Sequence, residues 1–393
     1  MTTSTPRPRP TSDRIAAIDW MCGLVIALMA VDHASLLWNG GRVAADSAYL
    51  VDPATGGPLW VPGSPLDGAQ FWTRWITHLC APTFLFLSGT SLAMSLARRR
   101  AAGASEGGLD RHLLIRALVI FAFEGLITLV SGMGMPFLQV LWAIGAAILA
   151  MIVLRRLPTQ LLLALGLAWL AGSELVLMRF FPPGGSDPSV VELALFTAGR
   201  HGSLFVLYPM THWLAMMILG WAFGRHLLER PANESARQDT EKLLLLCGLS
   251  ALLVWAYVRS ANGYGNMGLL RDDTTVIQWL HMSKYPPALV YSLMELGLMA
   301  LLLMGFLRFE RRMAHAPRAW NPLLVFGQTS LFFYVTHFLV LGLAASWITG
   351  GIGRRGLADA WIAAALTVAL LYPVCLGYRQ LKQRHPESWL QYV

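Results

Sequence analysis

The sequence predicts an all-α protein, a polytopic bundle of about ten transmembrane helices with both termini in the cytoplasm. Only 13% of its 393 residues are charged and 55% are hydrophobic, whereas an average soluble domain carries about 25% charged residues. Apolar runs of about 20 residues, the length that spans a bilayer, separate short clusters of charge. A soluble protein of this length would present a larger charged surface, so these observations exclude one.

Ten apolar segments form the predicted spans, because each is long enough to cross the hydrocarbon core of a membrane. They cover residues 15–38, 71–97, 112–131, 135–154, 159–180, 203–224, 242–260, 285–307, 321–348 and 358–379. The segments show no repeat of fixed period, so a duplicated transporter architecture has no direct support.

The positive charges predict the orientation of these spans. Of the 30 Lys and Arg residues, 21 lie in the N-terminal tail and in alternate loops, and 9 lie in the remaining loops. Positive residues concentrate on the cytoplasmic side, so both termini are expected there. This topology also accounts for the net charge of +8. No basic stripe with interleaved aromatic residues exists, so no nucleic-acid partner is expected.

The domain organisation follows from the spans. Residues 1–13 are rich in Pro, Thr and Arg and are expected to form a disordered cytoplasmic tail, because they cannot bury apolar area. Residues 14–393 are expected to form a single transmembrane domain. Long outer loops at 39–70, 181–202 and 261–284 are expected to shape a substrate entrance.

Ionisable side chains inside the predicted spans are the clearest functional signal. Such a group costs about 2.5–3.5 kcal/mol on insertion scales, so its presence requires a partner or a role. The residues concerned are Asp19, Asp32, His33, His78, Glu124, Glu174, His212, Glu295 and His337. A helix rises about 1.5 Å per residue, which puts the four histidines in one layer in the outer half of the membrane.

Three interpretations of this layer are open. A neutral histidine can take or give a proton near pH 7, and a carboxylate such as Asp32 can hold it in place, as general-base catalysis requires. Chains of Asp, Glu and His also serve proton-coupled transport. Each histidine alone could simply bond a neighbouring helix. Asp32 and His33 point about 100° apart on a helix, so Asp32 could instead pair with His78 or a substrate hydroxyl.

The sequence contains no motif for metal binding or for a serine nucleophile. The histidines come one per span, without a Glu-x-x-His or His-x-x-x-His pair, so no metal is expected. The four cysteines lie in apolar runs without metal-ligand spacing and are expected to be buried hydrophobic residues. A Gly-x-Ser-x-Gly nucleophile motif is absent from the sequence.

Several motifs together point to a known family. They are Arg14-Ile-Ala-Ala-Ile-Asp19-Trp20-Met21-Cys22-Gly23 with Met29-Ala-Val-Asp32-His33-Ala34, His78-Leu-Cys-Ala-Pro82-Thr-Phe-Leu-Phe-Leu-Ser88-Gly89, Gln139-Val-Leu-Trp142-Ala-Ile-Gly145, Lys284-Tyr285-Pro286-Pro287, Phe326-Gly327 with Leu331-Phe-Phe-Tyr334-Val-Thr-His337, and Ser388-Trp389-Leu390. Across almost its whole length the chain thus resembles the heparan-alpha-glucosaminide N-acetyltransferase-like family of bacterial membrane proteins, within the superfamily of transmembrane acyltransferases.

The resemblance implies a reaction and its partners. An acetyl or other acyl group would pass from cytoplasmic acetyl-CoA, or another acyl-CoA, to a sugar or envelope-glycan acceptor on the outer side of the bacterial inner membrane. Membrane lipids are the other expected partner, and the oligomeric state stays open, a dimer included. The alternative is a proton-coupled transporter of a sugar or a lipid-linked intermediate.

The resemblance also implies residue roles. His33 or His78 would act as the base, and Asp32 would orient the base or the acceptor. The expected substrate-binding residues are His337, Tyr334, His212, Glu124 and Glu295. The run Arg98, Arg99 and Arg100 is expected to attract the phosphates of CoA. In the related O-acyltransferase branch, an Arg in the first span precedes a catalytic His by eleven residues; here that His is His33, and Cys22 holds the Arg position.

Overall fold

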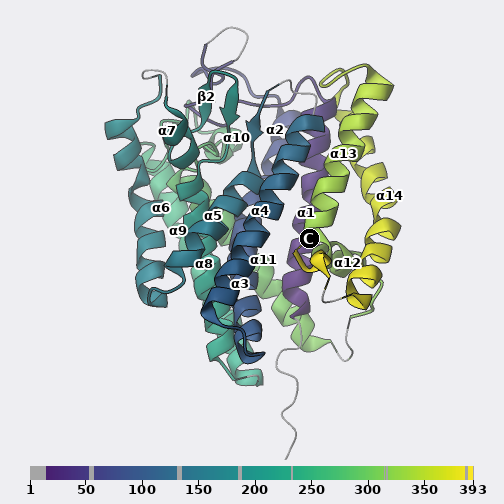
Figure 1. The fold of residues 1–393 in the computed structure, drawn as a ribbon. Helices are drawn as coiled ribbons and strands as arrows, with labels where there is room; N and C mark the ends of the chain where they lie inside the picture. The colour runs from purple at the N-terminus through teal and green to yellow at the C-terminus, as the bar shows by residue number, and fades with distance from the viewer. Residues whose placement is uncertain are drawn as a thin grey trace, which may run out of the picture.

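The computed structural model is a bundle of helices with a small sheet at one end (Figure 1), which confirms the predicted fold class. It describes residues 15–52, 57–130, 135–184, 188–231, 233–313, 315, 317–385 and 388–392. The predicted tail of residues 1–13 lies outside the described residues.

Within the described residues, eight helical segments are long and apolar enough to cross a membrane, as expected of a multi-pass membrane protein. They are α1 (Ala16–Trp38), α2 with α3 (Gly68–Ile76 and Cys80–Ala101), α4 (Glu106–Val130), α6 (Thr159–Phe180), α9 (Glu234–Ala261), α11 (Leu289–Arg312), α13 (Ser330–Thr349) and α14 (Leu357–Arg384). The other two predicted spans correspond to α5 (Val140–Leu154) and α8 (Met210–Glu229). With 15 residues, α5 is shorter than a typical spanning helix.

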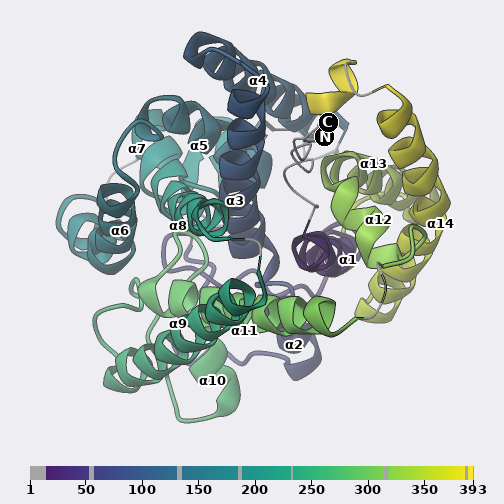
Figure 2. The same cartoon turned by 90° about the horizontal axis from the view of Figure 1, so that it is seen from below.

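Helix α1 occupies an interior position in the bundle (Figure 2). It packs against α3, α11, α13, α14 and the short helix α12 (Pro322–Gln328). Around it, α3 lies along α8, α9 lies along α11, and α4 lies along α5. By contrast, most of α9 is exposed at the bundle surface, as a lipid-facing helix would be. The polar residues of α1 are therefore surrounded by protein rather than by lipid.

The predicted span 71–97 is two helices, because the chain turns at residues 77–79 between α2 and α3. Pro82 lies in the first turn of α3 and has no backbone N–H, so it cannot bond the carbonyl of His78 four residues earlier. That carbonyl instead accepts a hydrogen bond of 3.0 Å from the hydroxyl of Tyr291 on α11. The turn directs His78 toward the interior of the bundle, where it is buried.

The predicted span 321–348 is also interrupted, at Thr329 between α12 and α13. The hydroxyl of Thr329 donates to the carbonyl of Val325 at 2.9 Å, and this kind of back-bonding bends helices. Its backbone leaves the helical region, with φ −123° and ψ 27°. The interruption gives α13 a direction of its own, independent of α12.

The predicted span 203–224 begins too early. Its first residues form β3 (Leu204–Val206), which pairs antiparallel with β2 (Gly199–His201) and parallel with β1 (Phe137–Leu138), in the order β1-β3-β2. Phe137 lies opposite Phe205, and Gly199 lies opposite Val206. Helix α8 starts only after Pro209, a residue well suited to the start of a helix.

The three long loops contain short helices at one end of the bundle (Figure 1). Helix α2 begins at the end of the first loop, α7 (Val190–Leu195) lies in the second, and α10 (Val276–Leu280) lies in the third. A short 3-10 helix, η1 (Trp389–Tyr392), closes the described chain and contacts α4.

Candidate functional site

A buried arginine joins two carboxylates near the loop end of the bundle. Arg74 on α2 donates to Oδ2 of Asp46 from Nε at 3.0 Å and from Nη2 at 2.6 Å. Its Nη1 donates to Oδ1 of Asp32 on α1 at 2.8 Å. Nη2 also donates to the hydroxyl of Tyr285 at 3.1 Å. One guanidinium thus ties together α1, α2 and two loops, an arrangement that uses its planar fork of donors.

Asp32 has further partners besides Arg74. Its Oδ1 accepts hydrogen bonds from Nη2 of Arg42 at 2.8 Å and from the hydroxyl of Thr77 at 3.0 Å. The backbone carbonyl of Asp32 also accepts from Arg42. These contacts anchor Asp32 to two arginines, and the structure places Asp46, not Asp32, next to His78.

Asp46 lies in the first loop, and its side chain is almost completely buried. Burial opposes its ionisation, but the Arg74 guanidinium and the neighbouring His78 outweigh burial and hold the pKa of that carboxyl well below its usual range. Nε2 of His78 lies 3.4 Å from Oδ2 of Asp46. Asp46 is therefore ionised at neutral pH and stands beside a buried imidazole.

His33 on α1 contacts His337 on α13 directly. Nδ1 of His33 lies 2.7 Å from Nε2 of His337, and the two rings are stacked at 11° with centroids 5.0 Å apart. Tyr334 meets each ring edge-on at 5.5 Å. Phe338 meets the ring of His33 at 4.7 Å. Three predicted site residues from opposite ends of the chain therefore form one cluster.

The hydrogen bonds of the pair determine where its protons lie. Nδ1 of His337 is 2.8 Å from the carbonyl oxygen of Phe333, which only accepts, so Nδ1 carries the hydrogen. In neutral His337, Nε2 then has a lone pair and accepts a hydrogen from Nδ1 of His33. Neutral His33 consequently keeps an unprotonated Nε2, which is the property that a general base needs.

Lys284 adds another cation to this region. It is buried, its backbone N–H donates to the carbonyl of Asp46 at 2.9 Å, and its ammonium lies 5.4 Å from the ring centroid of Tyr285. Arg42, Arg74 and Lys284 act electrostatically on Asp32, and Arg42 and Lys284 also act on His33. Lys284 faces Glu295 of α11 as well. Developing negative charge beside these cations would be stabilised.

The other predicted substrate-binding residues lie apart from one another. His212 on α8 is buried and packs edge-on against Trp169 of α6, with ring centroids 5.6 Å apart. Glu124 on α4 accepts a hydrogen bond from the backbone N–H of Gln139. Glu295 on α11 is fully buried. Of the four histidines predicted to share a layer, His33 and His337 are in contact, and His212 lies on the α6–α8 side.

Arg98, Arg99 and Arg100 lie in the last turn of α3, at the end of the helix opposite His78. Twenty residues of α3 separate Cys80 from Arg100, which is roughly 30 Å along the helix. Arg99 donates to Gln391 at 2.9 Å, and Arg100 donates to Glu106 at 2.7 Å.

Sequence reasoning missed four charged members of the cluster. Arg42 and Arg74 count only as outer-loop charges in the sequence, Lys284 is one of these charges and part of a family motif without an expected role, and Asp46 is not singled out. Arg74 precedes His78 by four residues within an apolar run, which is the spacing of one helical face and a usable signal. Asp46 had no comparable signal, because a loop residue acquires its partners only in the folded chain.

Metal coordination has no candidate centre in the part of the chain that the structure describes. Within those ranges, no group of three or more His, Cys, Asp and Glu side chains could hold an ion. The His33–His337 contact is a hydrogen bond between two rings.

The fold and the site define a multi-pass helical membrane protein with a buried pair of histidines near two arginines and a lysine. The family model for the catalytic domain of heparan-alpha-glucosaminide N-acetyltransferase matches residues 62–259, just over half of the chain. The chain therefore belongs to that family and is a membrane acyltransferase-like protein. No curated protein matches it. The matched segment contains Arg74 and His78, whereas His33, Lys284 and His337 lie outside it.

Proposed function

We propose that this protein transfers an acyl group from acyl-CoA to a hydroxyl or amine of a sugar or envelope glycan, with His33 as general base. The observation that carries the proposal is the His33–His337 hydrogen bond, which leaves Nε2 of His33 ready to accept a proton. Membership of an acetyltransferase family supports acyl-CoA as the donor.

In the proposed step, Nε2 of His33 takes the proton of the acceptor O–H or N–H group. The acceptor oxygen or nitrogen forms a bond to the thioester carbonyl carbon, and the carbon–sulfur bond breaks. His33 then returns the proton to the departing sulfur, so that CoA leaves as its thiol and the imidazole is neutral again. Such base catalysis contributes about 10²–10⁴-fold to a rate.

The neighbouring cations have a role in the same step. The thioester carbonyl oxygen gains negative charge as the acceptor attacks, and buried cations stabilise such charge. Arg74 and Arg42 are held in place by Asp32 and Asp46, so they need little rearrangement. In this proposal Asp32 positions the two arginines, and His78 with Asp46 binds the acceptor.

The donor is proposed to approach from the opposite end of the bundle. Arg98, Arg99 and Arg100 end α3 on that side, and guanidinium groups bind phosphates well. The concentration of positive charge there predicts the cytoplasmic side. The reacting carbonyl would then have to reach the histidine cluster near the loop end, and the bacterial inner membrane is the proposed location.

A direct assay tests the proposal. Purified protein in detergent is incubated with radiolabelled acetyl-CoA and a panel of amino sugars and envelope glycans. We expect labelled acceptor from the wild type and a loss of about 10²–10⁴-fold in His33→Ala. The matched control is His112→Ala on α4, whose ring packs on Tyr392 away from the cluster and which should retain activity.

The outcomes separate the competing functions. Normal acylation by His33→Ala would remove His33 from the mechanism and make His78 the next base to test. A wild-type protein that neither binds CoA nor labels any acceptor, but takes up sugar into vesicles in a proton-dependent way, would contradict the enzyme and support the transporter.

A further inference from the structure

Two cavities lined by residues of α6 and α8 adjoin each other. One, of about 600 Å³, lies between the end of α3, the α5–α6 turn and the end of α8. The other, of about 740 Å³, is a long groove between the α6–α8 pair and the α9–α11 pair. Figure 2 shows where these four helices lie in the bundle. Both are lined by Leu163, Ala222 and His226, so the two cavities meet at these three residues.

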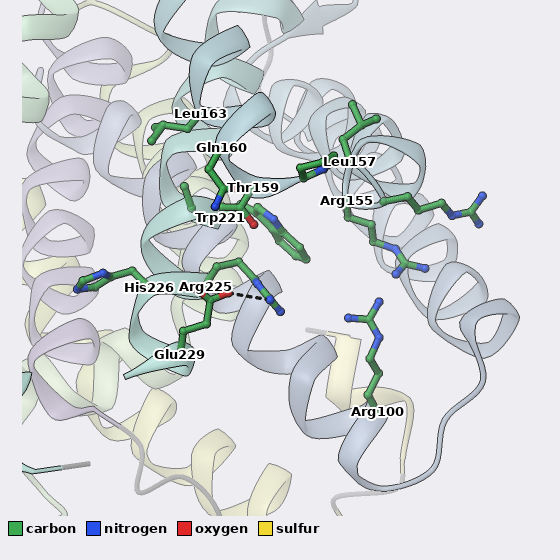
Figure 3. A pocket seen from close by; sticks show the side chains of 13 residues that line it. Arg100, Arg155, Leu157, Thr159, Gln160, Leu163, Trp221, Arg225, His226 and Glu229 are labelled. Carbon is green, nitrogen blue, oxygen red and sulfur yellow. Dashed lines mark hydrogen bonds and ion pairs between the residues drawn. The ribbon is translucent and has the colours of Figure 1, made fainter. Parts of the chain in front are cut away.

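The first cavity is cationic. In Figure 3 the guanidinium groups of Arg100, Arg155 and Arg225 point toward the same space, which Arg156 also lines. Their ion-pair partners are Glu106, Asp110 and Glu229. Four cations against three carboxylates leave one net positive charge at a site where an anion can bind.

Arg155 and Arg225 have donor groups that a ligand could bind. The side chain of Arg155 is fully buried, and its Nε has no hydrogen-bond partner among the described residues. Among the described residues, the ion-pair partner of Arg225 is Glu229 one turn later, and the Glu229 side chain is 61% exposed. Such surface pairs are weak, so a phosphate can take over this guanidinium.

The start of α6 adds backbone donors to the same cavity. Its N-cap is Pro158, which has no side chain that can accept from the first amides. Thr159 and Gln160 of the first turn line the cavity. A helix N-terminus without a cap offers unpaired N–H groups and a partial positive charge, and both favour an anion.

The second cavity suits an acyl chain. Its lining is almost wholly apolar, with Leu, Val, Phe and Met side chains from five helices, α3, α6, α8, α9 and α11. Along α11 it extends from Leu289 to Ala300, which is roughly 16 Å at 1.5 Å per residue. One end joins the cationic cavity, and the groove then follows the spanning helices.

We propose that the joined cavities bind one anionic phospholipid, with its phosphate between Arg155, Arg225 and the start of α6 and an acyl chain in the groove. The charge of the first cavity matches the phosphate, and the position of an apolar groove directly beside it, with three shared lining residues, matches a molecule with a charged head and an apolar tail. This site is separate from the histidine cluster, and it shares Arg100 with the arginine run proposed above to bind the donor, so the test below includes CoA as a competitor.

The test measures which lipid stays bound after purification. Protein reconstituted with equal amounts of phosphatidylglycerol and phosphatidylcholine is extracted in detergent and analysed by native mass spectrometry. We expect one retained phosphatidylglycerol per chain. Arg225→Gln should lower its retention about tenfold, since a charged hydrogen bond contributes about 1.5–3 kcal/mol. Arg237→Gln, an exposed arginine of α9 that lines neither cavity, is the matched control and should retain the lipid.

A second arm tests the groove. Ala222→Trp fills the junction of the cavities and should also lose the lipid, while folding is checked by gel filtration and thermal melting. Equal retention of both lipids, or full retention by Arg225→Gln, would overturn the proposal. Displacement of the lipid by inorganic phosphate or by CoA alone would show that the cationic cavity serves a soluble phosphate ligand, and this result would overturn it too.

Discussion

The imidazole of His33 has two nitrogens, and His337 determines which of them can accept a proton. His337 is itself fixed by the carbonyl of Phe333, one turn earlier on α13. Many hydrolytic enzymes likewise use a base whose orientation is fixed by a hydrogen bond to a second group, although here both groups are histidines. The acceptor nitrogen of His337 is therefore the feature that a substitution should preserve or remove.

We expect His337→Leu to lower the rate of acyl transfer about tenfold or more, because His33 loses the hydrogen bond that fixes its tautomer. His337→Gln supplies a side-chain oxygen that can accept the same hydrogen, and should restore part of the rate. The measurement is kcat and its pH profile for both variants. Equal rates for the Leu and Gln variants would mean that His337 serves packing and not proton placement.

The candidate site was only partly predictable at the level of residues. His33, His78 and His337 were predicted because an ionisable group within an apolar run conflicts with the surrounding lipid. Tyr334 was predicted through the family motif that it shares with His337. Asp46 was not, because charged residues are ordinary in a loop and only the folded chain shows that it is buried beside Arg74.

At the level of helices, close packing depends on glycine where α3 crosses α8. A Cβ atom on Gly220 would run into the backbone carbonyl of Phe86, and one on Gly89 would run into the carbonyl of Met217. Small residues let helix backbones approach in this way inside membranes. The crossing supports α3, which begins beside the histidine cluster and ends at the arginine run.

Gly220→Ala should therefore destabilise the protein by about 1–3 kcal/mol, because backbone atoms cannot move aside as a flexible side chain can. Gly305→Ala on α11 is the matched control, since a Cβ atom there meets open space. Alanine favours a helix by about 1 kcal/mol over glycine, so the control should be neutral or stabilised. Thermal melting in detergent measures both, and equal midpoints would contradict the packing argument.

The helices were easier to predict than their interruptions. Each of the ten apolar runs coincides with a helix or with two consecutive helices, because hydrophobic length alone identifies a span. The turn before α3 and the break at Thr329 depend on particular backbone hydrogen bonds, which hydropathy does not register. The start of α8 was misplaced because β3 is as apolar as a helix end.

At the level of the whole molecule, a buried histidine joins the loops that cover the cluster. His281 follows α10, and its Nε2–H donates to the carbonyl of Ala45 at 2.8 Å. Burial lowers the pKa of His281 below its usual value, and the bond to Ala45 offsets this only in part. The folded protein therefore holds His281 neutral at pH values where the unfolded chain would protonate it.

The stability of the protein should consequently fall as the pH drops below about 6.5, the unfolded pKa of histidine. The unfolded state then binds more protons, and each further pH unit costs up to about 1.4 kcal/mol until the folded group titrates. His281→Gln cannot be protonated and should show a shallower decline of the melting temperature between pH 7 and pH 5. Parallel declines for the two proteins would exclude His281 as a source of the pH dependence.

The ion pair between Asp32 and Arg42 also bears on how the chain enters a membrane during synthesis. Helix α1 precedes the other helices, so it reaches the bilayer before α2, α11 and α13 have been made. The later partners Arg74 and His337 lie 42 and 304 residues beyond Asp32 and His33. Arg42 lies only 10 residues beyond Asp32. The counter-ion of Asp32 therefore lies close behind α1 in the sequence, so this pair can form before the distant partners of Asp32 and His33 have been made.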